Sequence, residues 1–155
     1  MDALVGPYIT HVSFMKPVQI GGTTIGLNAI GAWVDMDPSN ILIVFSGEDI
    51  CKKIMTRDVI PMFSTTPKLK EHLTGRRWDK KTGGLKLRSC EISTGWAGSP
   101  ASLASIPFRR VVIDEVDKHP TWTGKEADSV SLGEARADTF GARKKIYKLS
   151  TPTTP

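Results

Sequence analysis

The sequence predicts an α/β fold with a mostly parallel sheet and helices on both of its faces. Apolar runs of strand length recur along the chain and alternate with segments of helical or turn composition. Two of these runs, Ile41–Phe45 and Val111–Ile113, are continuously apolar, as strands buried on both faces are. Strands joined by helices imply right-handed crossovers, and therefore parallel neighbours in one sheet.

Size and composition indicate one globular domain. The chain has 155 residues, with 39% hydrophobic and 24% charged residues. Its apolar runs all fall short of the ~18 residues of a membrane span, and the amino terminus lacks a secretory signal. Cys51 and Cys90 have no metal-type spacing and are interpreted as buried free thiols, with a disulfide possible only in an oxidising compartment.

The first half of the chain predicts two strands and three helices. A β-rich stretch, Tyr8–Met15, ends at Lys16-Pro17, and Thr24–Val34 is apolar on most sides, as a central packed helix is. A turn at residues 37–40 precedes the strand Ile41–Phe45. Ser46 and Asp49 form a capping pair for a helix that directs Ile50, Ile54 and Met55 inward. Thr66-Pro67 begins a further short helix, because proline suits the first turn.

The second half predicts a loop or hairpin followed by a strand, and then four further elements. Thr74–Gly84 is polar, basic and glycine-bearing, and is expected to be a loop or hairpin tip before the half-exposed strand Leu85–Arg88. Ser99-Pro100 begins a short helix of small residues. The remaining expected elements are the buried strand Val111–Ile113, a helix from the capping box Ser131/Glu134 to about Phe140, and the last strand Lys145–Leu149.

Three of the predicted strands are followed by polar segments suited to phosphate chemistry. In a parallel sheet, ligands bind outside the carboxyl ends of the strands, so these segments should meet. The first runs from Lys16 to Thr24 and offers Gly21, Gly22 and Thr23 before a helix, where backbone N–H groups can wrap a phosphate. Gly22 stands where such loops usually have lysine, so Lys16 would supply the ammonium; a plain glycine turn is the alternative.

The second and third segments supply carboxylates and hydroxyls. Asp114 would hold Mg²⁺ and Glu115 would orient the attacking water, whereas the alternative is a simple acidic turn after a strand. Ser150 and Thr151 follow the last strand and would sense the γ-phosphate; a helix cap or loop start is the alternative.

Positive charge is concentrated in one stretch. Residues 68–88 hold eight basic and two acidic side chains, whereas the net charge of the whole chain is +5. Such a stretch can neutralise DNA phosphates, with Arg76, Arg77, Lys80 and Lys81 as the candidate contacts. A solvated loop rich in lysine is the alternative.

Motifs dispersed over nearly the whole chain resemble the large terminase subunits of lambda-type phages. The matching residues are Lys16, Gln19, Gly21, Thr23, 28–31, 37–38, 60–62, 66–67, 99–103, 112–117, Pro120, Glu126, Asp128, Leu132, Arg136, Phe140 and 150–152. The resemblance implies a P-loop NTPase-type fold and ATP hydrolysis with Mg²⁺, coupled to translocation of double-stranded DNA into a capsid.

The resemblance also implies roles for named residues. Asp114 and Glu115 would be the Walker B pair, with Asp114 and Thr23 on the metal, and Ser150 and Thr151 would couple hydrolysis to movement. The atypical Walker A loop that binds ATP would consist of Lys16, Gln19, Gly21, Gly22, Thr23 and Thr24.

Family partners would be double-stranded DNA, a small terminase subunit, and the portal of the capsid, in the host cytoplasm and without a membrane. The full motor would be a homo-oligomer in which an arginine acts in trans, with Arg88, Arg136 and Arg143 as candidates. The chain is expected to be the motor domain shortened at both ends, without the nuclease domain that gives the parent its endonuclease activity. Rival hypotheses are a non-enzymatic DNA-binding module with a vestigial nucleotide pocket and a helicase-like ATPase.

Overall fold

A computed structural model describes residues 2–17, 20–99, 106–119 and 128–152. Its described strands form one seven-stranded sheet in the order β1-β7-β6-β2-β5-β4-β3. The first five strands in this order run parallel to one another, whereas β4 and β3 form an antiparallel hairpin at the far edge. The predicted α/β fold with a mostly parallel sheet is confirmed.

Strands and helices alternate along most of the chain. The strands are β1 (His11–Met15), β2 (Ile41–Phe45), β3 (Lys80–Lys81), β4 (Gly84–Lys86), β5 (Glu91–Trp96), β6 (Arg110–Ile113) and β7 (Lys145–Ser150). The α-helices are α1 (Asp2–Val5), α2 (Gly22–Met36), α3 (Glu48–Ile54), α4 (Ile60–Thr65), α5 (Pro67–Lys70) and α7 (Ser129–Ala135). The π-helix η1 (Met55–Val59) joins α3 to α4, and the 3₁₀ segments are η2 (Arg77–Asp79), η3 (Val116–Lys118) and η4 (Asp138–Arg143).

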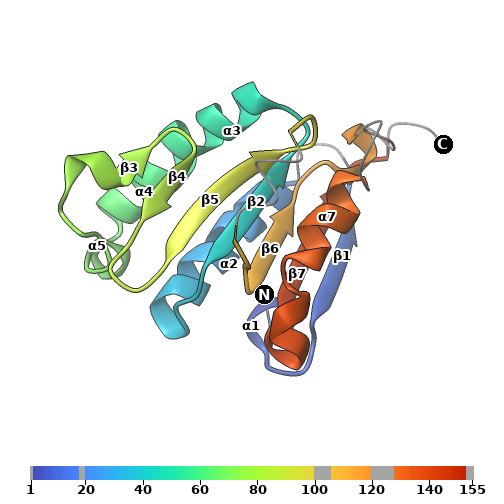
Figure 1. The fold of residues 1–155 in the computed structure, drawn as a ribbon, viewed down its shortest axis with the longest axis horizontal. Coiled ribbons are helices and arrows are strands. Elements are labelled where there is room, and N and C mark those ends of the chain that lie inside the picture. Colours follow the sequence, from blue (N-terminus) through green and yellow to red (C-terminus); the bar gives the residue numbers. More distant parts are fainter. Residues whose placement is uncertain (1, 18–19, 100–105, 120–127, 153–155) are drawn as a thin grey trace.

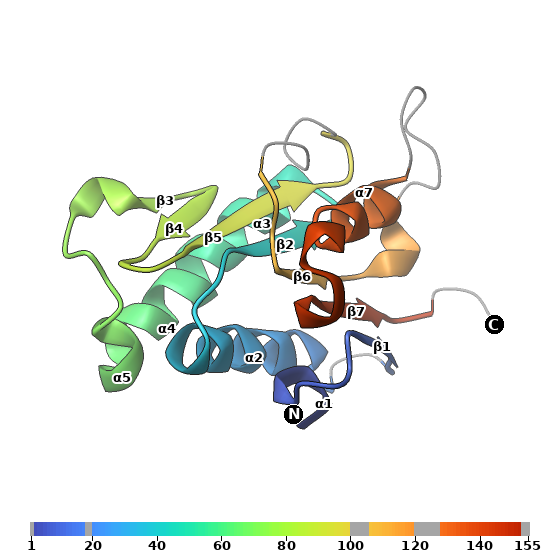
Figure 2. The ribbon, with the colours of Figure 1, turned by 60° about the horizontal axis from the view of Figure 1, so that its bottom comes forward.

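Helices cover both faces of the sheet. In Figures 1 and 2, α2, α3 and α4 lie on one face, and α7 lies on the other over β6 and β7. Side chains of β2 alternate between the two layers: Ile41, Ile43 and Phe45 pack under α2 and α3, whereas Leu42 and Val44 pack under α7. All five residues are buried, as their continuous apolar run predicted.

Strand β5 lies within residues 89–98, where the sequence pattern predicted neither a helix nor a strand. The strand pairs in parallel with β2 and antiparallel with β4, so it connects the hairpin to the main sheet. Its sequence, Glu-Ile-Ser-Thr-Gly-Trp, mixes polar residues with glycine and therefore lacks the apolar signal of β2. The neighbouring prediction of a hairpin tip within Thr74–Gly84 is confirmed by η2, β3 and the turn into β4.

Two predicted helix caps are wrong. Gly47, in extended conformation, precedes α3, and no side chain caps that helix; Ile50 is 41% exposed, whereas Met55 is fully buried. The other helix begins at Ser129 rather than after Ser131, because the Asp128 carboxylate accepts hydrogen bonds from the backbone of Val130 and Ser131. It ends at Ala135 and gives way to η4, not to a helix running to Phe140.

The remaining helical predictions have mixed outcomes. Helix α2 contains the predicted Thr24–Val34 and extends beyond it at both ends, and α5 begins at Pro67 as expected. The helix expected after Ser99 falls on residues outside the described part. Within the described part, the helices are all too short or too polar to cross a membrane.

Candidate functional site

The candidate site lies at the carboxyl ends of β1, β7 and β6. Strand β7 sits between the other two, with Met15 of β1 opposite Ser150 of β7. Each strand is therefore followed by one of the three polar segments predicted from sequence: the Lys16–Thr24 segment after β1, Asp114-Glu115 after β6, and Ser150-Thr151 at the end of β7. The topology brings the three segments to one edge of the sheet, as the sequence predicted.

Lys16 is held at the centre of this edge. Its backbone N–H donates to the Ser150 carbonyl at 3.0 Å, which continues the pairing of β1 with β7. Its buried side chain reaches past the strand end and donates from Nζ to Thr151 Oγ1 at 2.8 Å. The same ammonium lies 3.6 Å from Glu115 Oε1. One cation thus contacts both other segments.

Gly21 and Gly22 form the entry to α2. Gly21 has φ 79°, a left-handed conformation that favours glycine, and its carbonyl accepts the first hydrogen bond of the helix from Ile25 N–H at 3.0 Å. A β-carbon on Gly22 would lie 2.4 Å from Lys16 Cδ and 2.8 Å from Leu149 Cδ2. The stem of Lys16 therefore fills the space that a side chain at position 22 would need.

Thr23 and Asp114 connect α2 to β6. Thr23 Oγ1 donates to Asp114 Oδ2 at 3.0 Å, and the Asp114 side chain is buried. The other carboxylate oxygen, Oδ1, is also buried and has no hydrogen-bond partner among the described residues. Burial raises the pKa of Asp114 above its ordinary value, against the opposing effect of the Thr23 hydrogen bond. A free carboxylate oxygen beside a threonine hydroxyl is a donor set that Mg²⁺ accepts.

Glu115 stands in a different environment from its neighbour. It has φ 55° and ψ 50°, the one left-handed conformation among the described non-glycine residues, which turns the chain sharply after β6. Its Oε2 lies 2.7 Å from Lys118 Nζ, and the hydrogen bond from Lys118, followed by Lys16, lowers the pKa of Glu115. The two adjacent carboxyl groups are therefore shifted in opposite directions.

Ser150 and Thr151 connect the other two segments. Ser150 Oγ accepts a hydrogen bond from Asp117 N–H in the turn after Glu115, at 3.0 Å, while Thr151 Oγ1 accepts from Lys16. A small hollow of about 260 Å³ opens beside them, lined in part by Met15, Val116 and Leu149.

Other predicted residues lie elsewhere. Thr24 is exposed in the first turn of α2, and Gln19 falls outside the described residues. The candidate arginines Arg88, Arg136 and Arg143 lie near the amino ends of β5, β6 and β7, at the opposite edge of the parallel strands from the site. They therefore cannot act on a ligand of their own site.

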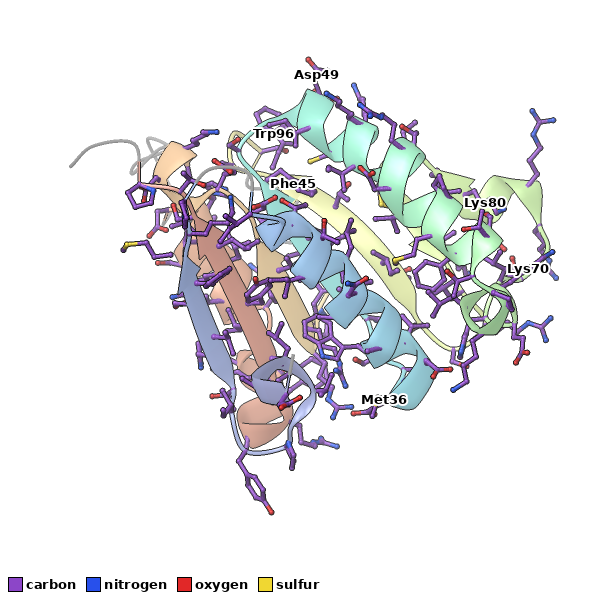
Figure 3. The ribbon with its side chains drawn as sticks, turned by 180° about the vertical axis from the view of Figure 1, so that it is seen from behind. Met36, Phe45, Asp49, Lys70, Lys80 and Trp96 are labelled. Carbon is purple, nitrogen blue, oxygen red and sulfur yellow. The ribbon has the colours of Figure 1, made fainter. Side chains whose placement is uncertain are left out.

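The basic residues form a separate surface. Arg76, Arg77, Lys80 and Lys81 are exposed on η2 and β3, and Figure 3 shows Lys80 and Lys70 at the end of the molecule remote from β1. Lys80 Nζ donates to Ser64 Oγ at 3.2 Å. Next to them, a hollow of about 690 Å³ lies over β4 and β5 and includes Lys81, Lys86 and Glu91 in its lining.

Sequence reasoning missed two residues close to the carboxylates. Lys118 follows Glu115 by three residues, and this spacing of opposite charges could have indicated an ion pair from the sequence. The Tyr147 side chain is buried on β7 against Gly26, and the Asp114 charge adds to the burial that raises its pKa to about 12. Its hydroxyl has no hydrogen-bond partner within the described part of the chain, and no local pattern marks it.

A glycine-bearing helix entry and adjacent carboxylates at the carboxyl edge of a parallel sheet are the arrangement expected of nucleotide-binding α/β proteins. A sequence model described as "Phage terminase large subunit gpA, ATPase domain" matches residues 1–155, and the chain belongs to this family. A search of curated protein sequences finds no match.

Solved structures of phage terminases share the fold. The Thermus phage P74-26 large terminase ATPase domain has a TM-score of 0.67 at 17% identity, over 94% of this chain and 61% of that one. The HK97 bacteriophage large terminase has a TM-score of 0.71 at 14% identity, over 96% and 31%. The large terminase of a thermophilic bacteriophage, in complex with ADP, has a TM-score of 0.67 at 13% identity, over 97% and 37%. The chain thus spans between 31% and 61% of the lengths of these three proteins.

Proposed function

We propose that this chain is the ATP-hydrolysing core of a motor that drives double-stranded DNA into a phage capsid. The observation that carries the proposal is the meeting of Lys16, Thr23, Asp114 and Glu115 at one edge of the sheet, linked by direct contacts. Family membership supports it, and the ADP complex of the similar terminase from a thermophilic bacteriophage agrees with a nucleotide ligand.

The entry of α2 binds the phosphates. The N–H groups of the first helical turn, which includes Gly22, Thr23 and Thr24, have no partners within the helix and favour a negative charge. Gly21 turns the backbone toward this end, and Lys16 adds its ammonium at the position that a side chain on residue 22 cannot occupy. Gln19 is assigned to the same loop on the family resemblance alone.

Asp114 and Thr23 hold Mg²⁺. The unpartnered Oδ1 of Asp114 is the specific fit, because a buried carboxylate oxygen without a donor is costly unless a cation is bound nearby. When bound, the ion neutralises charge that develops on the phosphate oxygens. The pKa of Asp114, raised by burial, is expected to fall in its presence.

Glu115 orients the attacking water. Its pKa is lowered by Lys118 and Lys16, so the carboxylate is ionised at neutral pH and can accept a hydrogen bond from water. Its Oε2 lies 2.7 Å from Lys118 Nζ, so Oε1 is the oxygen left to accept the hydrogen bond of the water.

Ser150 and Thr151 couple hydrolysis to movement. They contact the turn after Glu115 and the ammonium of Lys16, respectively, so a displacement at either segment reaches the end of β7. In the complete motor, which we propose is a homo-oligomer, a neighbouring subunit would supply the arginine that stabilises transition-state charge.

The exposed basic surface of Arg76, Arg77, Lys80 and Lys81 contacts DNA phosphates. It lies away from the nucleotide site, so DNA binding and hydrolysis are separable by mutation. We further propose, from the family, that the parent protein cuts DNA with a nuclease domain and works in the host cytoplasm with a small terminase subunit and the portal.

Titration of the chain with a fluorescent ATP analogue and Mg²⁺ tests the proposal. Binding should weaken by about tenfold or more in Lys16→Ala, because removal of one phosphate-contacting charge costs about 1.4 kcal/mol or more. The matched control is Lys53→Ala, which removes an exposed lysine of α3. Equal affinity in both variants, or no dependence on Mg²⁺, would exclude the proposed site.

A non-enzymatic DNA-binding module is the competing hypothesis, favoured by the exposure of the basic surface. It predicts salt-sensitive DNA binding together with no detectable nucleotide binding by the same preparation.

A further inference from the structure

His119 has a buried side chain that contacts the backbone of Asp114, and the proposed mechanism gives it no role. It is 7% exposed and follows the 3₁₀ turn η3, five residues after Asp114. Its ring returns toward the strand end, where Nε2 lies 2.8 Å from the Asp114 carbonyl oxygen. On the other side, Nδ1 lies 2.9 Å from Ser129 Oγ, which is fully buried.

The Asp114 carbonyl determines which nitrogen of the His119 ring carries a hydrogen. A backbone carbonyl can only accept, so Nε2 carries a hydrogen and donates it to Asp114. Nδ1 makes the second hydrogen bond of the ring, with the Ser129 hydroxyl. His119 thus bridges the end of β6 and the first residue of α7, which are separated in sequence by residues 120–127 outside the described part.

The carbonyl that His119 holds belongs to the peptide unit that leads into Glu115. Glu115 has a left-handed backbone, φ 55° and ψ 50°, which costs a non-glycine residue on the order of 1 kcal/mol or more. Surrounding bonds must therefore maintain it, and three of them converge on this turn: His119 to Asp114 O, Lys118 N–H to Glu115 O at 2.8 Å, and Asp117 N–H to Ser150 Oγ at 3.0 Å. Only the first of these comes from a side chain of the turn itself.

We propose that His119 is a positioning residue for ATP hydrolysis, which locks the turn that aims the Glu115 carboxylate and ties this turn to α7. This inference rests on the proposed function of Glu115. Helix α7 is a firm anchor, because the Asp128 carboxylate caps it and its Gly133 packs closely over Val44, Ile113 and Val111. Through its two hydrogen bonds, His119 therefore fixes the position of the Glu115 turn relative to the core of the sheet.

Two substitutions separate this role from simple packing. His119→Ala removes both hydrogen bonds, whereas His119→Gln keeps an amide N–H that can reach the Asp114 carbonyl. We expect His119→Ala to lower kcat by about tenfold or more with KM for MgATP within about threefold, and His119→Gln to recover most of kcat. Ser129→Ala, which removes only the hydrogen bond at Nδ1, should fall between the two.

The matched control is His72→Ala. His72 is a partly buried histidine whose Nε2 lies 3.7 Å from Asp35 Oδ1 of α2. Within the described part of the chain, no hydrogen bond or ion pair joins it to Asp114 or Glu115, so its removal should leave kcat unchanged. Unchanged kcat in His119→Ala would overturn the inference. So would a parallel loss of kcat, nucleotide affinity and thermal stability that His119→Gln does not repair.

A second measurement does not depend on turnover. The distance between the amide and α protons of Glu115, measured by NMR as a nuclear Overhauser effect on the nucleotide-free chain, is short at positive φ and longer at negative φ. The positive-φ value should persist in His119→Gln and disappear in His119→Ala; persistence in both variants would reject the lock. If the native chain itself fails to hydrolyse ATP, the proposed function fails while this measurement still decides the role of His119.

Discussion

The side-chain stem of Lys16 lies against Gly22, so that a β-carbon on the glycine would be 2.4 Å from Lys16 Cδ. The two residues belong to opposite ends of the loop between β1 and α2, yet they share one space. This relationship explains in physical terms why position 22 has no side chain: Cδ and Cε of Lys16 already occupy that side of the helix entry, and Thr151 Oγ1 accepts a hydrogen bond from the Lys16 ammonium.

Variants that place a lysine at position 22, with and without Lys16, test whether the two residues share one space. Gly22→Lys should bind nucleotide at least about tenfold more weakly than the native chain, since its side chain would overlap Lys16 and Leu149 and overpacking costs about 1–3 kcal/mol. Lys16→Ala/Gly22→Lys removes the overlap with Lys16 and restores one ammonium, so it should bind better than either single variant. Affinities for a fluorescent ATP analogue with Mg²⁺ measure the effect. Additive losses in the double variant would contradict the shared-space explanation.

Glu115→Gln should abolish hydrolysis while ATP affinity stays within about threefold, because the amide keeps the shape but cannot activate water. Phosphate release and analogue binding are the two measurements. Asp117→Asn is the matched control, since it changes a neighbouring carboxylate whose backbone, not its side chain, contacts Ser150. Full activity in Glu115→Gln would remove Glu115 from the mechanism.

Replacing Arg76, Arg77, Lys80 and Lys81 by glutamine should flatten the salt dependence of DNA binding. The slope of log K against log salt is negative, and removing one phosphate-binding charge lowers its magnitude by about 0.9. Removing four charges would therefore lower the magnitude by about 3 to 4. The nucleotide affinity should not change, because these residues lie on or next to β3, the edge strand farthest from β1 in the sheet. A control set with the same charge change is Lys52, Lys53, Arg57 and Arg143. An equal decrease of the slope in both sets would show that the net charge, and not this surface, drives binding.

Cys51 and Cys90 should resist alkylation in the folded chain. Burial raises the pKa of each thiol to about 11, and Cys51 Sγ also donates to the Gly95 carbonyl. At about pH 8 the thiolate fraction is then on the order of one in a thousand, against roughly one in four for a free cysteine. Because the folded pKa is raised, the associated stability is present below about pH 8.5 and is lost as the pH rises toward 11. Iodoacetamide labelling followed by mass spectrometry, with and without urea, measures this; rapid labelling of the native chain would contradict it.

Asp128→Ala should lower the free energy of unfolding by about 1 kcal/mol at neutral pH, the usual cost of losing an N-cap. Hydrogen bonds from the Ser131 side chain and backbone lower the pKa of Asp128, so its contribution is present above the ordinary carboxyl pKa and is lost as the pH falls through the folded value. Urea unfolding at neutral and strongly acidic pH should therefore show a difference between the two chains only at neutral pH. Asp138→Ala, which removes a surface pair with Lys144, is the control and should change stability less.

The sequence predicted the parallel sheet because its central strands are buried on both faces. Ile41–Phe45 and Val111–Ile113 have no polar position, and that pattern is independent of where the strands sit in the sheet. Strand β5 could not be found in this way, since its burial depends on β2 on one side and the hairpin on the other. The residues of β5 pair with β2 and β4, and a local sequence pattern does not reveal these distant partners.

The helix starts were harder to predict than the helices. Ser131 and Glu134 have the spacing of a capping box, yet the Asp128 carboxylate takes the free N–H groups three residues earlier. Both motifs are compatible with the sequence, and the helix begins where the Asp128 carboxylate accepts the backbone hydrogen bonds of Val130 and Ser131.

The site was predictable where chain order and strand order agree. Lys16, Asp114 and Thr151 each follow a strand, so a parallel sheet alone brings them to one edge. His119 reaches the site through the left-handed turn at Glu115, and a glutamate at that position does not predict such a turn. The roles of the gathered residues remain predictions that the experiments above decide.

The position of β7 has a mechanical consequence. This strand is hydrogen-bonded in parallel to β1 on one side and to β6 on the other, and the chain leaves it at Thr151-Pro152. Tension applied at that exit along the strand axis is shared by both ladders in shear, so their bonds resist together and do not open one after another. The exit from β7 is thus a stiff attachment point, suited to transmit a pull with little stretch.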